Sequence, residues 1–286
     1  MNNSSGEIRA LITLLGDDDS HIRDIARDRL LNIGQDAEEY LREATSTDLE
    51  GKVRIQARHV LEKIRQDDLI SSFYLLGLLD DDQIDLEHAA FLVARVGYSD
   101  LQEAPYREEL DRLAEEVRWR ISRMNPAREG RRIVETINRV LFEEEGFYGN
   151  VDEYYNPENS YLHRVLERRT GIPVSLSVIY LLIARRLDLP MHGISMPVHF
   201  ICKYQTSHES FFFDPFHAGR IITRAECIKL LHGSGQRFED SFLEPASPRR
   251  IVGRMVRNLF LIYYQNEHSE KATLLDRILK LLRIPE

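Results

Sequence analysis

The residues with the clearest chemical potential are a histidine and an aspartate on two neighbouring apolar segments. The stretch "ISMPVHFICKY", 194–204, alternates apolar residues with others and predicts one β-strand, with His199 on the face opposite the core. The polar "QTSHES" then predicts a hairpin to a second strand, "FFFD". With Tyr204 opposite Phe211, Asp214 lies diagonally beside His199, within reach of a hydrogen bond. Such a bond holds an imidazole in the tautomer that a general base needs.

Two simpler interpretations of His199 stay open at this point. An isolated histidine on a strand is more often solvated or hydrogen-bonded than catalytic. A shift of one residue in the hairpin register would also place His199 and Asp214 on opposite faces of the sheet. The pairing therefore depends on the register of the hairpin.

A serine at the start of a buried helix is the candidate nucleophile. The run Val178–Ala184 is apolar for seven residues, which predicts a helix that is buried on all sides. Ser175 lies near the expected start of this helix, where free backbone N–H groups and a partial positive charge favour a developing anion. Ser175 is thus either a helix cap, the commoner role, or a nucleophile with His199 as base and Asp214 orienting it.

The segment 146–160, "GFYGNVDEYYNPENS", is expected to line the same site. Its Gly, Asn, Tyr and Pro content predicts a long ordered loop. Its tyrosines offer apolar area to bury, and its asparagines can bond local backbone. The expected site-lining residues are Tyr155, Asn156, Asn159, Pro173 and Ser177.

The elements around this core are predicted to be helical. "HIRDIARDRLLNIG" matches "KVRIQARHVLEKIR" at a fixed offset, and resembles HEAT-type helical repeats, with an unrelated bundle as the alternative. The matched pairs are Arg23 with Arg54, Ala26 with Ala57, and Leu30 with Leu61. Residues 68–145 continue the helical pattern. "TRAE", 223–226, predicts a capping box, and Ser247 followed by Pro248 predicts the start of a C-terminal helical hairpin.

The length, charge and cysteine content of the chain exclude several classes of function. The chain has 286 residues, enough for about two domains, and a formal charge of -9. This charge argues against nucleic-acid or anionic-membrane partners. The two cysteines, Cys202 and Cys227, form no CxxC pair, and their scarcity fits a reducing compartment. We expect a cytoplasmic protein without metal or cofactor, since the sequence shows no signal peptide, phosphate-loop, dinucleotide-binding or zinc-protease motif.

The segments "GNVDEYYNPENS", "GIPVSLS", "PVHF" and "FFFDPFHAGR" together resemble the bacterial SirB-type branch of the transglutaminase-like superfamily. "RMVRNLFLIYYQNEHSEKATLLDRILKLL" resembles a tetratricopeptide-type helix pair. The resemblance implies an α+β fold with a papain-like core, in which a buried helix packs on a small antiparallel sheet. The expected divisions are HEAT-like repeats in 1–67, a helical segment in 68–145, the core in 146–245 and the C-terminal hairpin in 246–286.

The resemblance also places His199 and Asp214 on the superfamily's histidine and aspartate, but its cysteine is missing. That position falls on Pro173, or on Ser175 if two residues of slack are allowed. Proline cannot be a nucleophile, and a hydroxyl ionises far less readily than a thiol. Two functions follow as alternatives. One is a protein-interaction or regulatory module with a protein partner; the other is a hydrolase or acyltransferase on amide or ester bonds through Ser175, His199 and Asp214.

Overall fold

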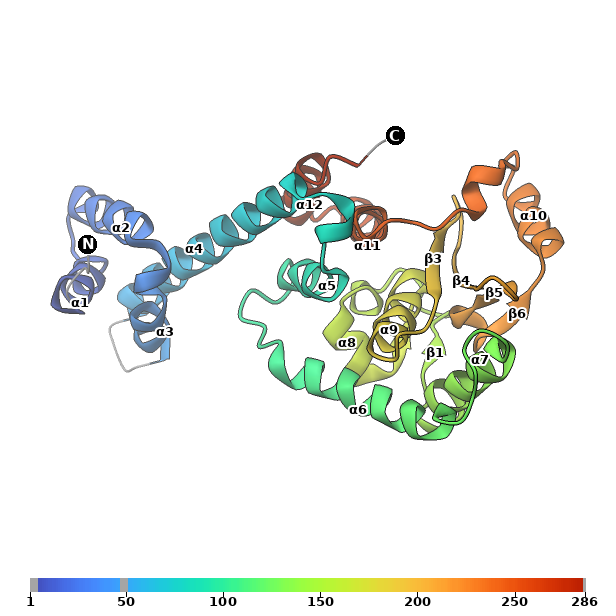
Figure 1. Cartoon of the computed structure of the whole chain (residues 1–286). Helices are drawn as coiled ribbons and strands as arrows, with labels where there is room; N and C mark the ends of the chain where they lie inside the picture. Colours follow the sequence, from blue (N-terminus) through green and yellow to red (C-terminus); the bar gives the residue numbers. More distant parts are fainter. Residues whose placement is uncertain (1–4, 47–50, 285–286) are drawn as a thin grey trace. The chain divides into compact units, whose positions relative to one another are not determined.

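A computed structural model describes residues 5–46 and 51–284, which form two compact units, 1–72 and 73–286 (Figure 1). Helix α4, Gly51–Leu78, contributes residues to both units. The division expected at residue 67 therefore falls inside one continuous helix.

The first unit is entirely helical in its described part. It contains α1 (Ser5–Leu14), α2 (Ser20–Ile33), α3 (Glu38–Ser46) and α4 as far as residue 72. The alanines and leucines of the sequence match are all buried in the same apolar cluster: Ala26, Ala57, Leu30 and Leu61. Small alanines let the helices approach closely, so the matching positions share one packing role.

The second unit combines helices with two small sheets. Its helices after α4 are α5 (Leu86–Arg95), α6 (Ala104–Ile121), α7 (Gly130–Asn138), α8 (Leu162–Arg168), α9 (Pro173–Arg186), α10 (Arg224–Gly233), α11 (Pro248–Gln265) and α12 (Ser269–Leu281). The strands are β1 (Tyr148–Gly149), β2 (Thr170–Gly171), β3 (Met191–Ser195), β4 (Phe200–Gln205), β5 (Ser210–Asp214) and β6 (Arg220–Ile222). Strands β1 and β2 pair in parallel, and β3–β4–β5–β6 form an antiparallel sheet in that order.

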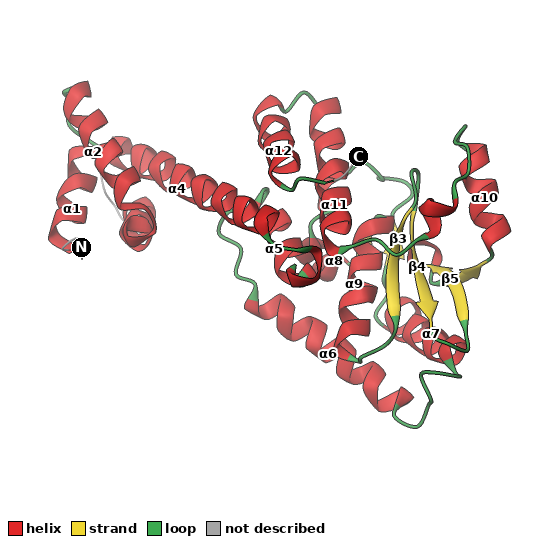
Figure 2. Ribbon diagram, turned by 45° about the horizontal axis from the view of Figure 1, so that its top comes forward, coloured by secondary structure: helices red, strands yellow, loops and turns green. Residues whose placement is uncertain are grey.

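The four-stranded sheet lies between α9 and α10 (Figure 2). On one face, the Tyr180 ring of α9 packs 4.8 Å from the Phe213 ring of β5. On the other face, Ile201 of β4 shares an apolar cluster with Cys227 of α10. Every residue of Val178–Ala184 is buried, which confirms the prediction of a helix enclosed on all sides.

The prediction of one strand over 194–204 is wrong. The stretch holds the end of β3 and most of β4, which run antiparallel with Ser195 opposite Phe200. The residues between them form the connecting turn, and His199 lies at its end. Pro197 has no N–H to donate to a sheet and interrupts the ladder. The predicted register of the following hairpin is confirmed, because Tyr204 lies opposite Phe211.

The predicted caps are also confirmed. Thr223 and Glu226 form a reciprocal capping box at the start of α10. The Ser247 side chain accepts a hydrogen bond from the Arg250 N–H at the start of α11. Helices α11 and α12 then pack against each other as a C-terminal pair.

Arg249 joins α11 to the ends of two other helices. Its guanidinium donates to the Asp81 carboxylate at 2.6 Å and to the Leu282 carbonyl at 2.8 Å. It also donates to the carbonyls of Gly77 and Leu79. The side chain is 9% exposed, so its removal leaves several carbonyl oxygens without a donor away from water.

We expect Arg249→Met to lower the free energy of unfolding by about 3 kcal/mol, because one buried charge and its acceptors lose their partners together. Urea denaturation followed by circular dichroism measures this change. The neighbouring Arg250→Met is the control. Arg250 is exposed and outside any described ion pair, and its substitution should cost less than about 0.5 kcal/mol. Equal losses in the two variants would contradict the role of Arg249.

Candidate functional site

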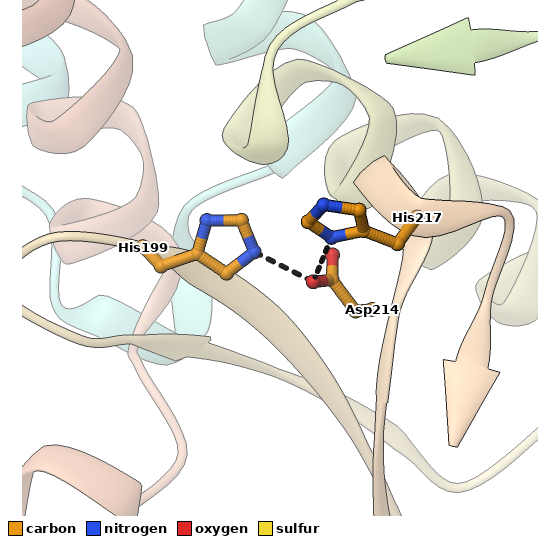
Figure 3. Close-up of side chains that lie close together, drawn as sticks. All are labelled: His199, Asp214 and His217. Carbon is orange, nitrogen blue, oxygen red and sulfur yellow. Dashed lines mark hydrogen bonds and ion pairs between the residues drawn. The ribbon is translucent and has the colours of Figure 1, made fainter. Parts of the chain in front are cut away.

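His199 and Asp214 meet at one end of the four-stranded sheet, just before β4 begins and where β5 ends. The His199 Nε2 atom lies 2.7 Å from Asp214 Oδ2 (Figure 3). The Asp214 side chain is 4% exposed and that of His199 is 14% exposed. The expected contact is therefore present, although His199 reaches it from a turn and not from the middle of a strand.

A second histidine, which the sequence analysis missed, completes the cluster. His217 Nδ1 lies 2.7 Å from the same Oδ2 atom of Asp214. Asp214 is the N-cap of a short 3₁₀ helix, Pro215–His217, and its Oδ1 accepts the Phe216 N–H at 3.0 Å. The sequence signal for this contact is the run "DPFH". A capping Asp followed by Pro at the first helical position predicts a helical turn, which brings the fourth residue, His217, close to the first, Asp214.

The electrostatics determine which atoms carry protons. Burial raises the pKa of Asp214, but the hydrogen bonds and charges of His199 and His217 outweigh it, and the pKa lies below its usual range. The carboxylate is thus ionised at neutral pH and can only accept, so each histidine donates an N–H to it. When Nε2–H of His199 is donated to the carboxylate, Nδ1 is the ring nitrogen left to take part in proton transfer.

The same three residues are also the metal candidates. His199 Nε2, Asp214 Oδ2 and His217 Nδ1 all lie within 4.8 Å of one another. Each imidazole that donates to the carboxylate would have to give up that N–H before it could bind a metal ion through the same nitrogen.

The loop 146–160 contributes one aromatic side chain to this site. The half-buried Tyr154 ring packs 6.1 Å from the Phe216 ring, which in turn lies 6.1 Å from the His199 ring. Phe216 also presses against Gly149 of β1, where a Cβ would have no room. Tyr155 is 64% exposed, and its ring contacts the Tyr154 ring in an edge-to-face arrangement. The loop thus partly buries one tyrosine at the site, whereas three were expected to be buried.

Ser175 is not brought to the histidines. Its hydroxyl is fully buried, donates to the Asn159 carbonyl at 2.6 Å and accepts the Ile172 N–H at 3.0 Å. No hydrogen bond joins it to His199 within the described residues. This geometry is that of a helix cap, which also ties α9 to the preceding loop.

The remaining expected site-lining residues support the backbone. Asn159 is buried, and its amide donates to the Glu153 carbonyl at 2.7 Å. Asn156 caps a short 3₁₀ helix by accepting the Glu158 N–H. Pro173 is the buried first residue of α9, and the buried Ser177 lies next to Cys202.

Neither thiol can act as the nucleophile. Cys202 and Cys227 are both buried. Burial raises the pKa of Cys202 strongly and that of Cys227 to about 11. Both sulfurs therefore remain protonated at neutral pH and make little thiolate.

We expect Asp214→Asn to lower the free energy of unfolding at pH 7 by about 2–3 kcal/mol, because the hydrogen bonds lose their charged acceptor. The folded-state pKa is lowered, so the stabilisation is present above the ordinary value of about 3.9 and disappears as pH falls through the lowered one. Urea unfolding at several pH values should show a difference from wild type that shrinks in acid.

The control for Asp214 is Asp240→Asn, which removes an 83% exposed carboxylate paired with Arg224. Its effect should stay below about 1 kcal/mol. A pH-independent loss in Asp214→Asn would contradict an ionised acceptor.

Within the described residues, no helix is both long enough and apolar enough to cross a membrane.

Comparison with known proteins finds relatives for the part of the chain that contains His199, Asp214 and His217. Residues 104–257 match the family model described as the transglutaminase-like superfamily. A UPF0162 protein of Xylella fastidiosa is 36% identical over 216 residues, which cover 72% of this chain and 75% of the relative. F-box only protein 21 of Mus musculus is 35% identical over 135 residues, 44% of this chain and 21% of that protein. No solved structure gives a significant match.

The superfamily match contains α9, the four-stranded sheet and the His199–Asp214 contact, and it extends over more than half of the chain. The similarity to the bacterial UPF0162 protein extends over nearly three quarters of it. The chain therefore belongs to the transglutaminase-like superfamily.

Proposed function

We propose that this chain is a protein-interaction or regulatory module of the SirB-type branch, built on a transglutaminase-like core that lacks a nucleophile. The observation that carries the proposal is the start of α9. Pro173 occupies its first position, and the Ser175 hydroxyl is buried in a capping role. A residue that attacks a carbonyl must reach the substrate with a free lone pair, and neither residue meets this requirement.

The helical parts support binding as the function. The first unit buries matching alanines and leucines in one cluster, as HEAT-like repeats do, and α11 with α12 forms a pair like a tetratricopeptide unit. Helix pairs of these kinds present surfaces for protein partners. A protein partner in the cytoplasm is thus the proposed setting, and the charge of -9 argues against nucleic acid.

The mammalian relative adds support for a module. The matched region is about a fifth of F-box only protein 21. A core of this kind therefore also occurs as one part of a larger protein, which is how interaction modules are commonly used.

The second candidate is a hydrolase or acyltransferase that uses Ser175, His199 and Asp214. The observation in its favour is the hydrogen bond between His199 Nε2 and Asp214 Oδ2. For this function, Ser175 would have to give up its bonds to Asn159 and Ile172 and become exposed.

A serine-directed fluorophosphonate probe distinguishes the two candidates. We expect no covalent label on the intact wild-type chain by mass spectrometry, with a known serine hydrolase labelled under the same conditions. Label at Ser175 that disappears in a folded His199→Ala variant would overturn the proposal and establish the enzyme.

Substitution of Ser175 tests the capping role separately. We expect Ser175→Ala to lower the free energy of unfolding by about 1–2 kcal/mol, because the Ile172 N–H loses its acceptor and the Asn159 carbonyl loses a donor. Ser177→Ala is the matched control, since this equally buried hydroxyl lies next to the Cys202 thiol and bonds no backbone group within the described residues. It should be close to neutral, and a larger loss at Ser177 would contradict the assignment.

A further inference from the structure

A cavity of about 320 Å³ lies between α11 and the turn that follows β3. Its polar lining comes mainly from Arg250, Arg254, Arg257 and Asn258 of α11. Apolar walls come from side chains such as Phe242 and Leu261. The volume is at the small end of the range typical of small-molecule sites, about 300–1,000 Å³.

In the part of the chain that the structure describes, the three arginines have no acidic partner. Their spacing of four and three residues places them on one face of the helix. No carboxylate of the described residues forms an ion pair with any of them, and the cavity lining contains no acidic residue. Helix α11 itself contains no Asp or Glu. A chain with a net charge of -9 thus places three arginines around one cavity with no ion-pair partner among the described residues.

Burial of Arg254 and its proximity to Arg257 both disfavour the charged form of its guanidinium. Arg254 is half-buried, and its Nη1 donates to the Met196 carbonyl at 2.6 Å. Burial lowers the pKa of Arg254; Tyr154 raises it, and the nearby Arg257 lowers it again. An anion in the cavity would relieve the repulsion between these guanidinium groups and replace lost hydration.

We propose that this cavity binds a small organic phosphate, with the phosphoryl group between Arg250, Arg254 and Arg257 and the organic part against Phe242 and Leu261. The planar guanidinium matches two phosphate oxygens at once, and three cations suit a dianion better than a single carboxylate. Asn258 offers a further neutral donor beside the anion. Neither His199 nor Asp214 lines the cavity, so binding there does not require a catalytic role for them.

The site adjoins the His199 cluster through one turn. Pro197 lines the cavity, Met196 accepts from Arg254, and His199 follows two residues after Pro197. A ligand held by Arg254 therefore contacts the segment that carries His199.

Isothermal titration calorimetry of the full-length chain at constant ionic strength tests the proposal. The probes are phenyl phosphate, inorganic phosphate and phenylacetate. We expect phenyl phosphate to bind about tenfold more tightly than inorganic phosphate, because its ring gains apolar contact. It should also bind at least tenfold more tightly than phenylacetate, which has the ring but a single negative charge.

Variants locate the binding within the molecule. Arg250→Gln and Arg257→Gln should each weaken phenyl phosphate binding about five- to tenfold, and circular dichroism should stay unchanged because both side chains are exposed. Arg277→Gln, an exposed arginine on α12 outside the lining, should bind like wild type. Absence of binding, equal affinity for phenylacetate, or unchanged affinity in the Arg250→Gln/Arg257→Gln double variant would each overturn the proposal.

Discussion

A helix without a polar face must be covered on every side, and this constraint organises the second unit. The run Val178–Ala184 of α9 is buried throughout. One side of α9 packs on β3 and β4, and other sides contact α6, α8 and α11. An exposed run of this kind would leave hundreds of Å² of apolar surface in water, at roughly 25 cal/mol per Å². The sheet, the preceding helices and the C-terminal pair therefore share one buried centre.

The histidine–aspartate cluster depends on that packing. The short 3₁₀ helix Pro215–His217 contacts α9 directly, so the end of β5 is held against the buried helix. Asp214 is thereby removed from water. A carboxylate in such a buried position needs several hydrogen-bond donors to remain ionised. Three donors serve it: His199, His217 and the Phe216 N–H. The two imidazoles serve as structural partners of a buried charge as well as candidates for chemistry.

The superfamily core is thus present, and the start of α9, where the resemblance would place a cysteine, holds Pro173 and Ser175. Pro173 begins α9, Ser175 closes its first turn, and both thiols are buried elsewhere. A buried network of hydrogen bonds can persist without catalysis, because removal of one member leaves the others unpaired at a cost of about 1–3 kcal/mol. The three arginines of α11 are different, since no ion pair within the described residues accounts for their grouping. Their grouping points to a ligand from outside the chain.

Periodicity and capping residues determined the local elements of this protein. The apolar run predicted the enclosed helix α9, and the polar segment between apolar ones placed Tyr204 opposite Phe211. These features depend on neighbours in sequence, which a pattern records directly. Pro197 also signalled the turn between β3 and β4, but the alternation of apolar residues on both sides of it suggested one continuous strand. Only the tertiary structure decided that Ser175 faces the Asn159 carbonyl and that α11 directs its arginines toward the turn after β3. Each of these contacts joins groups whose positions follow from how helices and strands pack, and no spacing in the sequence encodes which side chains then meet.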